Sequence, residues 1–115
     1  MSVKIYHNPR CKKSRAGLEY LEKKTGEFTK IEYLKTGLSE EEIREMLTSL
    51  KISPSELVRT QEAVYKKELK GKQFSDDEWI AIIAKNPKLL KRPVVISGKD
   101  AVIGDPPGNI DKIIN

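Results

Sequence analysis

Several kinds of residue and pattern are scarce in this 115-residue sequence, and each scarcity excludes a class of protein. A single cysteine, Cys11, rules out a disulfide framework. There is no long apolar run and no N-terminal signal pattern, so we expect a soluble cytoplasmic protein without a membrane segment. The aromatic residues are one Trp, four Tyr and two Phe, without the basic–aromatic alternation that single-stranded nucleic acids stack on, so no nucleic-acid partner is expected.

Positive charge is in moderate excess, with 22 Lys and Arg against 17 Asp and Glu and a net charge of +5. The basic residues are spread along the chain, and the lysine pairs at 23–24 and 66–67 lie close to glutamates. This distribution favours a mildly basic, solvated surface. The length is that of one domain, so we expect a single domain over residues 1–115 and a monomer.

The only cysteine and the only histidine lie together in the stretch 5–15, IYHNPRCKKSR, where a strand gives way to a helix. A thiol at a helix N-terminus faces unpaired N–H groups and the positive end of the helix dipole, which favour the thiolate. Nearby basic side chains act in the same direction: Arg10, Lys12, Lys13 and Arg15. At the ordinary pKa of about 8.5, roughly 3% of a thiol is ionised at pH 7. We therefore expect Cys11 to be a nucleophile or redox centre, not a packed apolar side chain.

Hydrophobic spacing predicts a β-α-β opening. Residues 3–6 and 28–34 have strand character, and the helix between them spans about 12–24 and closes at Gly26. The two strands should run parallel. Capping boxes then begin two amphipathic helices, at Ser39 with Glu42 and at Ser75 with Glu78. Shorter helical pieces are expected over 54–58 and over 61–69.

The C-terminal part reads as a β-hairpin followed by a helix. Apolar runs at 94–96 and 101–103 flank the turn 97–100, and Asn109 is expected to cap the last helix. The complete order, β-α-β, several inserted helices and β-β-α, predicts an α/β, thioredoxin-like three-layer fold with a four-stranded mixed sheet. That fold places Arg92-Pro93 beside Cys11, with Pro93 in the cis form.

With these motifs in place, the chain resembles the glutaredoxin-linked arsenate reductase (ArsC) family, within the ArsC/Spx superfamily, over nearly its whole length. The matching segments are the N-terminal IYHNPxCxxSR at 5–15, YLKT at 33–36, RT at 59–60 before EAVY at 62–65, NP at 86–87, RPVV at 92–95 and IGxPP at 103–107.

The resemblance implies a role for several residues. Cys11 matches the cysteine that attacks arsenate, and Arg59 and Arg92 match two arginines that hold the oxyanion. Glutathione and glutaredoxin, as co-substrate and partner, then complete the reduction to arsenite. No bound cofactor or metal is implied. Arginine suits this role because its planar fork can bind a tetrahedral anion through two hydrogen bonds.

Four other residues support the site in this interpretation: His7, Ser14, Arg15 and Pro93. His7 either carries a charge near Cys11, hydrogen-bonds it, or simply packs. Ser14 stands where a Cys-x-x-Cys motif has its second thiol, so an external thiol must resolve any adduct on Cys11.

One position departs from the family, because the family's Gly-Arg-Pro reads Gly104-Asp105-Pro106 here. If Asp105 faces the site, it repels the oxyanion and opposes the thiolate. If it turns outward, Arg10 or Lys13 can supply the missing charge. This departure also leaves two alternatives open: an Spx-like regulator that binds RNA polymerase, and a general glutathione-dependent thiol reductase.

Overall fold

The computed structural model describes residues 2–114, and the chain divides into two compact units. The first unit consists of Met1–Thr36 and Arg92–Asn115, and the second of Gly37–Lys91. Each unit is described by itself below. The expectation of one domain over the whole chain stays a prediction.

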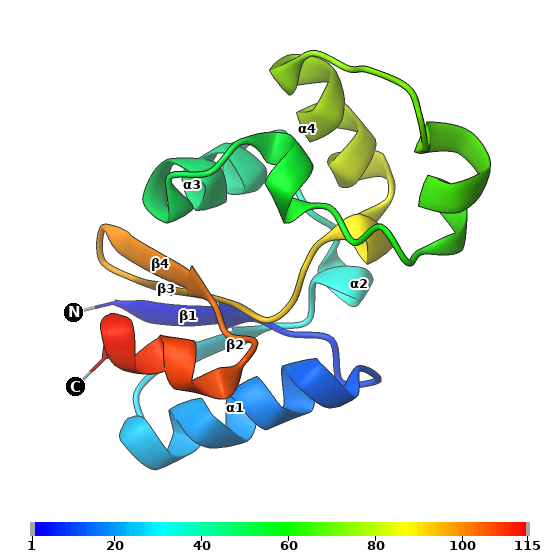
Figure 1. Ribbon diagram of the computed structural model, residues 1–115. Coiled ribbons are helices and arrows are strands. Elements are labelled where there is room, and N and C mark those ends of the chain that lie inside the picture. Colours follow the sequence, from blue (N-terminus) through cyan, green and yellow to red (C-terminus); the bar gives the residue numbers. More distant parts are fainter. Residues whose placement is uncertain (1, 115) are drawn as a thin grey trace. The chain divides into compact units, whose positions relative to one another are not determined.

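The first unit is built on a four-stranded mixed sheet, as the sequence predicted (Figure 1). Its strands are β1 (Val3–Tyr6), β2 (Thr29–Ile31), β3 (Val94–Ser97) and β4 (Asp100–Ile103), in the order β2-β1-β3-β4. β1 runs parallel to β2 and antiparallel to β3, and β3 pairs antiparallel with β4. The central strands β1 and β3 are therefore hydrogen-bonded on both sides.

One face of this sheet is covered by α1 (Lys12–Lys24) and by the short 3₁₀ helix η4 (Pro107–Lys112). The core there consists of Ile5, Leu21, Val95 and Ile110, all fully buried. These residues come from β1 and α1 near the N-terminus and from β3 and η4 near the C-terminus. Burial of their apolar surface thus holds α1 against the sheet and against η4. The cysteine directly before α1 is positioned by the same packing.

The second strand is shorter than predicted. We expected a strand over 28–34, but β2 covers Thr29–Ile31 and the chain turns into a short helix, α2 (Tyr33–Thr36). β1 supplies no strand pairing beyond Tyr6, which pairs with Ile31. Because β1 offers no strand partner there, the backbone of these residues forms local hydrogen bonds instead. The N–H groups of Lys35 and Thr36 donate to the carbonyl of Glu32.

The second unit is helical, with α3 (Glu40–Leu50) and α4 (Asp76–Lys85) as its main elements. Both predicted capping boxes are present, since Ser39 and Ser75 accept from the backbone N–H groups of Glu42 and Glu78. Three single-turn helices complete the unit: η1 (Pro54–Leu57), η2 (Tyr65–Leu69) and η3 (Pro87–Leu89). The helix predicted over 61–69 is thus only partly correct, because η2 is a wide π-type turn.

The C-terminal helix also differs from the prediction. Asn109 lies inside η4 and does not cap it. Its amide donates instead to the carbonyls of Ile103 (3.0 Å) and Asp105 (3.3 Å), which ties the loop after β4 to the helix. Farther along η4, Asp111 accepts from the Tyr20 hydroxyl at 2.7 Å and pairs with Lys24, both on α1.

Candidate active site

Cys11 occupies the N-cap position of α1, directly after the loop that follows β1. Its backbone is extended (φ −99°, ψ 123°), and its side chain is partly exposed. Its N–H donates to the carbonyl of Asn8 at 3.0 Å, and its own carbonyl accepts from Arg15 at 2.9 Å. The sulfur therefore stands at the open end of a 13-residue helix, accessible to a reactant.

The surroundings of Cys11 favour the thiolate. Partial burial alone raises the pKa of the Cys11 thiol, but the N–H groups of Ser14 and Lys13 and the guanidinium of Arg92 lower it, and together they prevail. The side chain makes no standard capping hydrogen bond to α1, so these donors act through the charge that forms when the thiol ionises. The cysteine predicted as a nucleophile has the electrostatic environment that such a role requires.

A buried network holds the loop before Cys11. The Ser14 hydroxyl lies 2.8 Å from Nδ1 of His7 and accepts from the N–H of Asn8 at 2.9 Å. The Asn8 side chain in turn accepts from the N–H of Arg10 at 3.0 Å. His7, Asn8 and Ser14 are almost completely buried, so this network positions the loop rather than meeting a ligand. Sequence reasoning did not single out Asn8.

Arg15 contributes to the same loop. Its guanidinium donates to the carbonyl of Pro9 at 2.9 Å while the side chain remains exposed. This contact bridges the first turn of α1 and the loop that precedes it. Arg15 therefore holds this loop, and its supporting role at the site stays a prediction.

His7 does not supply a positive charge to the thiolate. Burial lowers the pKa of His7, and the charge of Lys30 lowers it further, outweighing Glu32 and the contact with Ser14. The ring is therefore neutral at pH 7. Of the roles considered for His7, a packed and hydrogen-bonding one fits the geometry.

The lowered pKa of His7 predicts a pH effect on stability. As pH falls below about 6.5, the unfolded chain binds a proton at His7 before the folded chain does, so the free energy of unfolding decreases until pH reaches the lowered folded value. His7 is the only histidine. His7→Asn should therefore make the free energy of unfolding less dependent on pH below about 6.5. Urea unfolding of both proteins at several values between pH 7 and pH 5 measures this. If the free energy of unfolding changes with pH equally in the wild type and in His7→Asn, the predicted role of His7 is wrong.

Arg92 and Pro93 lie where the fold interpretation placed them. The Arg92–Pro93 peptide bond is cis, which confirms that prediction, and the bond between Asp105 and Pro106 is cis as well. Arg92 is 9% exposed, and its guanidinium reaches Cys11 as both a hydrogen-bond donor and a charge. Thus Cys11 and Arg92, distant in sequence, do converge.

Asp105 forms an ion pair with Lys13, with 3.5 Å between Oδ2 and Nζ. Both side chains are partly exposed, and Lys13 belongs to the first turn of α1. The two charges offset one another, so Lys13 cannot supply the charge of the absent arginine without competition from Asp105.

Arg59 belongs to the second unit, so its convergence with Cys11 stays a prediction. Its Nη1 lies 2.6 Å from Oε2 of Glu62, and both side chains are mostly buried. An oxyanion that binds Arg59 would therefore have to share the guanidinium with a carboxylate.

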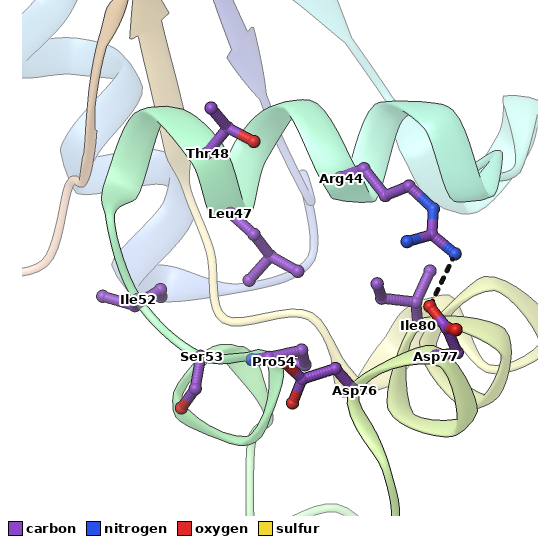
Figure 2. Close-up of a pocket in the computed structure, with 9 residues that line it drawn as sticks. All are labelled: Arg44, Leu47, Thr48, Ile52, Ser53, Pro54, Asp76, Asp77 and Ile80. Atoms are coloured by element: carbon purple, nitrogen blue, oxygen red, sulfur yellow. Dashed lines mark hydrogen bonds and ion pairs between the residues drawn. The ribbon is translucent and has the colours of Figure 1, made fainter.

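A pocket of about 480 Å³ lies within the second unit, between α3, η1 and α4 (Figure 2). Leu47 and Ile80 point into it, and Arg44 closes one side through its ion pair with Asp77 at 3.0 Å. None of the candidate site residues lines this pocket.

Residues 2–114 contain no group of three or more His, Cys, Asp or Glu side chains placed to hold a metal ion. In the same range, no helix has both the length and the apolar content needed to cross a membrane.

The sheet order, the thiol at the first strand–helix junction and the cis-proline before β3 define a protein of thioredoxin-like fold with a single cysteine at that junction. The model of the ArsC family matches residues 6–113. The chain belongs to the ArsC family.

Individual relatives agree with this assignment. The uncharacterised protein YfgD of Escherichia coli is 39% identical over 114 residues, covering 97% of this chain and 96% of that protein. An arsenate reductase of Haemophilus influenzae is 36% identical over 116 residues, covering 99% and 100%. Among solved structures, an arsenate reductase from Vibrio cholerae superimposes with a TM-score of 0.91 at 39% identity, covering 98% of each chain.

Proposed function

We propose that this protein reduces arsenate to arsenite, with Cys11 as the nucleophile and glutathione and glutaredoxin as the source of electrons. The observation that carries the proposal is the single cysteine at the start of α1, with a lowered pKa and the Arg92 guanidinium beside it. Membership of the ArsC family and the similarity to proteins described as arsenate reductases support the choice of substrate.

The chemistry needs few groups. The Cys11 thiolate attacks arsenic, an S–As bond forms, and an oxygen leaves as water after protonation. A glutathione thiolate then attacks the Cys11 sulfur: an S–S bond forms, and arsenic leaves with the two electrons of the broken S–As bond as As(III). A glutaredoxin thiolate then attacks the glutathione sulfur of this mixed disulfide, and the Cys11 thiolate leaves. Arg92 and Arg59 hold the anionic oxygens during the attack.

A coupled assay tests this proposal. Purified protein, arsenate, glutathione, glutaredoxin, glutathione reductase and NADPH are combined, and NADPH oxidation and arsenite are both measured. We expect arsenate-dependent turnover that disappears in Cys11→Ser and when glutaredoxin is omitted. Absence of arsenite formation by the wild-type protein would refute the proposal.

The ion pair between Lys13 and Asp105 favours a second candidate, a thiol–disulfide reductase that acts on glutathione mixed disulfides. Such a substrate needs less positive charge than a divalent oxyanion, and Asp105 reduces the positive charge near the thiol. The same coupled assay with a glutathionylated peptide in place of arsenate distinguishes the two. Turnover of the peptide alone selects the reductase, and inactivity with both substrates selects a binding role such as the Spx-like regulator.

Removal of the Asp105 charge should improve anion binding. Asp105→Asn releases Lys13, and Asp105→Arg adds a further cation, so arsenate or sulfate affinity should rise and the pKa of the Cys11 thiol should fall, more in the arginine variant. Because the pair is partly exposed, we expect a gain of up to about fivefold for Asp105→Asn. Titration at fixed ionic strength measures the affinity. Asp100→Asn, an equal charge change in the β-hairpin, serves as the control. Equal affinities in all variants would exclude Asp105 from the site.

A further inference from the structure

Gly17 lies in the interior of α1 and is buried. A β-carbon at this position would lie 2.4 Å from Cγ of Pro93, 3.2 Å from its Cδ and 3.1 Å from the carbonyl oxygen of Gly104. Real β-carbons essentially never approach other atoms closer than 3.0 Å. The helix can therefore rest on the proline ring only because residue 17 has no side chain.

A second glycine also lies close to the proline ring, with a milder restriction. Gly104 is buried, and a β-carbon there would lie 3.1 Å from Cγ of Pro93 and 3.4 Å from Cδ1 of Ile110. Its N–H donates to the carbonyl of Pro93 at 2.7 Å. Cγ of Pro93 is thus approached closely by two glycines, one on α1 and one directly after β4.

Helix geometry does not explain a glycine at position 17. Gly17 has no positive φ, so any residue could adopt its backbone conformation. Glycine also weakens a helix interior relative to alanine. The close approach to Pro93 is the feature that requires it.

This contact is connected to the thiol from both ends. Gly17 and Cys11 belong to the same rigid segment, about one and a half helical turns apart. Pro93 directly follows Arg92, whose guanidinium reaches the Cys11 sulfur. The separation between α1 and the proline ring therefore sets the separation between sulfur and guanidinium.

We propose that Gly17 is a positioning residue, whose missing side chain seats α1 on Pro93 and so sets the contact between the Cys11 sulfur and the Arg92 guanidinium. The role rests on the proposed function only in that it concerns the same thiol. The contact itself exists without any substrate.

Gly17→Ala tests the proposal through the reactivity of the only cysteine. We expect the midpoint of the alkylation rate against pH to rise toward that of a free thiol, and turnover in the coupled assay to fall by about ten- to a hundredfold, because small displacements of reacting groups are costly. A role confined to packing would lower the melting temperature and leave the alkylation midpoint unchanged, which would overturn the proposal. Gly26→Ala is the matched control, because a β-carbon there meets nothing within 4 Å and φ is not positive.

A second comparison isolates the clash as the cause. In a Pro93→Ala background, which lacks Cγ and Cδ, Gly17→Ala should shift the alkylation midpoint far less than it does in the wild type. An equal shift in both backgrounds would overturn the proposal. If Gly17→Ala does not fold, Gly104→Ala presses on the same ring carbon from a different segment, with a milder contact of 3.1 Å. It should raise the midpoint in the same direction, and no shift there would count against the proposal.

Alkylation needs no oxyanion, so the two proposals can fail separately. A raised midpoint in Gly17→Ala supports the positioning role even when the wild-type protein reduces no arsenate. An unchanged midpoint refutes that role even when arsenate is turned over.

Discussion

Replacement of Arg92 by alanine is expected to reduce turnover by about a hundred- to a thousandfold, the usual effect of removing one donor that stabilises an anionic transition state. In this structure Arg92 lowers the pKa of the Cys11 thiol, and the proposed function gives it a second role, binding the oxyanion that the thiolate attacks. Arg92→Ala should therefore raise the pKa of the Cys11 thiol and weaken oxyanion binding together. Arg92→Lys should keep the positive charge but lose the planar guanidinium that makes two hydrogen bonds to one anion. It should therefore recover only part of the activity.

Turnover in the coupled assay and the pH dependence of Cys11 alkylation, measured on the wild type, Arg92→Ala and Arg92→Lys, test this effect. Lys91→Ala is the control, because it removes the adjacent cation, whose backbone N–H bonds to Leu57 in the second unit. It should leave both the thiol pKa and turnover unchanged. The account fails if Arg92→Ala has the same thiol pKa as the wild type, since the observed contact would then have no chemical consequence.

Loss of the Ser14 hydroxyl is expected to lower the stability of the protein strongly. Ser14 is fully buried and serves two buried partners, the N–H of Asn8 and the ring of His7. Each partner left without a hydrogen bond costs about 1–3 kcal/mol. Ser14→Ala should therefore lower the free energy of unfolding by about 2–6 kcal/mol, a large part of the 5–15 kcal/mol typical of a domain.

Equilibrium urea unfolding of Ser14→Ala measures this loss directly. Ser49→Ala makes the same change within α3, where no hydrogen bond of the hydroxyl is observed, and it should be neutral or slightly stabilising because alanine favours helix. If Ser14→Ala and the wild type have the same urea midpoint of unfolding, the buried network does not contribute to stability.

The parts of the fold that local signals specify were predictable. The span of α1 agrees with the predicted 12–24, and both capping boxes begin helices where Ser39 and Ser75 placed them. Apolar runs around Gly98 became the hairpin of β3 and β4. Each of these elements is determined by residues within a few positions of it, so a single sequence suffices.

The sequence-based predictions are wrong where the local structure depends on contacts with segments distant in the sequence. Residues 32–34 have strand composition, but the strand ends where β1 stops offering pairing partners. Asn109 resembles a helix cap, yet its amide bonds two carbonyls of the loop after β4. Neither outcome can be read from neighbouring residues, because both depend on segments brought together by the fold.

The site shows the same division. Cys11 and Arg92 were predictable because reactive residue types stand out and the family resemblance links them. Asn8 and Gly17 were missed, since a loop asparagine and a helix glycine are unremarkable until the Ser14 hydroxyl and the Pro93 ring are seen next to them. A glycine inside an amphipathic helix pattern, where alanine would be better, was the only sequence signal available.

The central claim is that Cys11 is held ready as a thiolate by the start of α1 and by Arg92. The rate of iodoacetamide alkylation of the wild-type protein, measured from pH 4 to pH 10, tests this without any assumption about substrate. Cys11 is the only cysteine, so the label reports on one site. The rate should rise with pH and level off with a midpoint clearly below about 8.5, the value of a free thiol. A midpoint at or above that value would contradict the account.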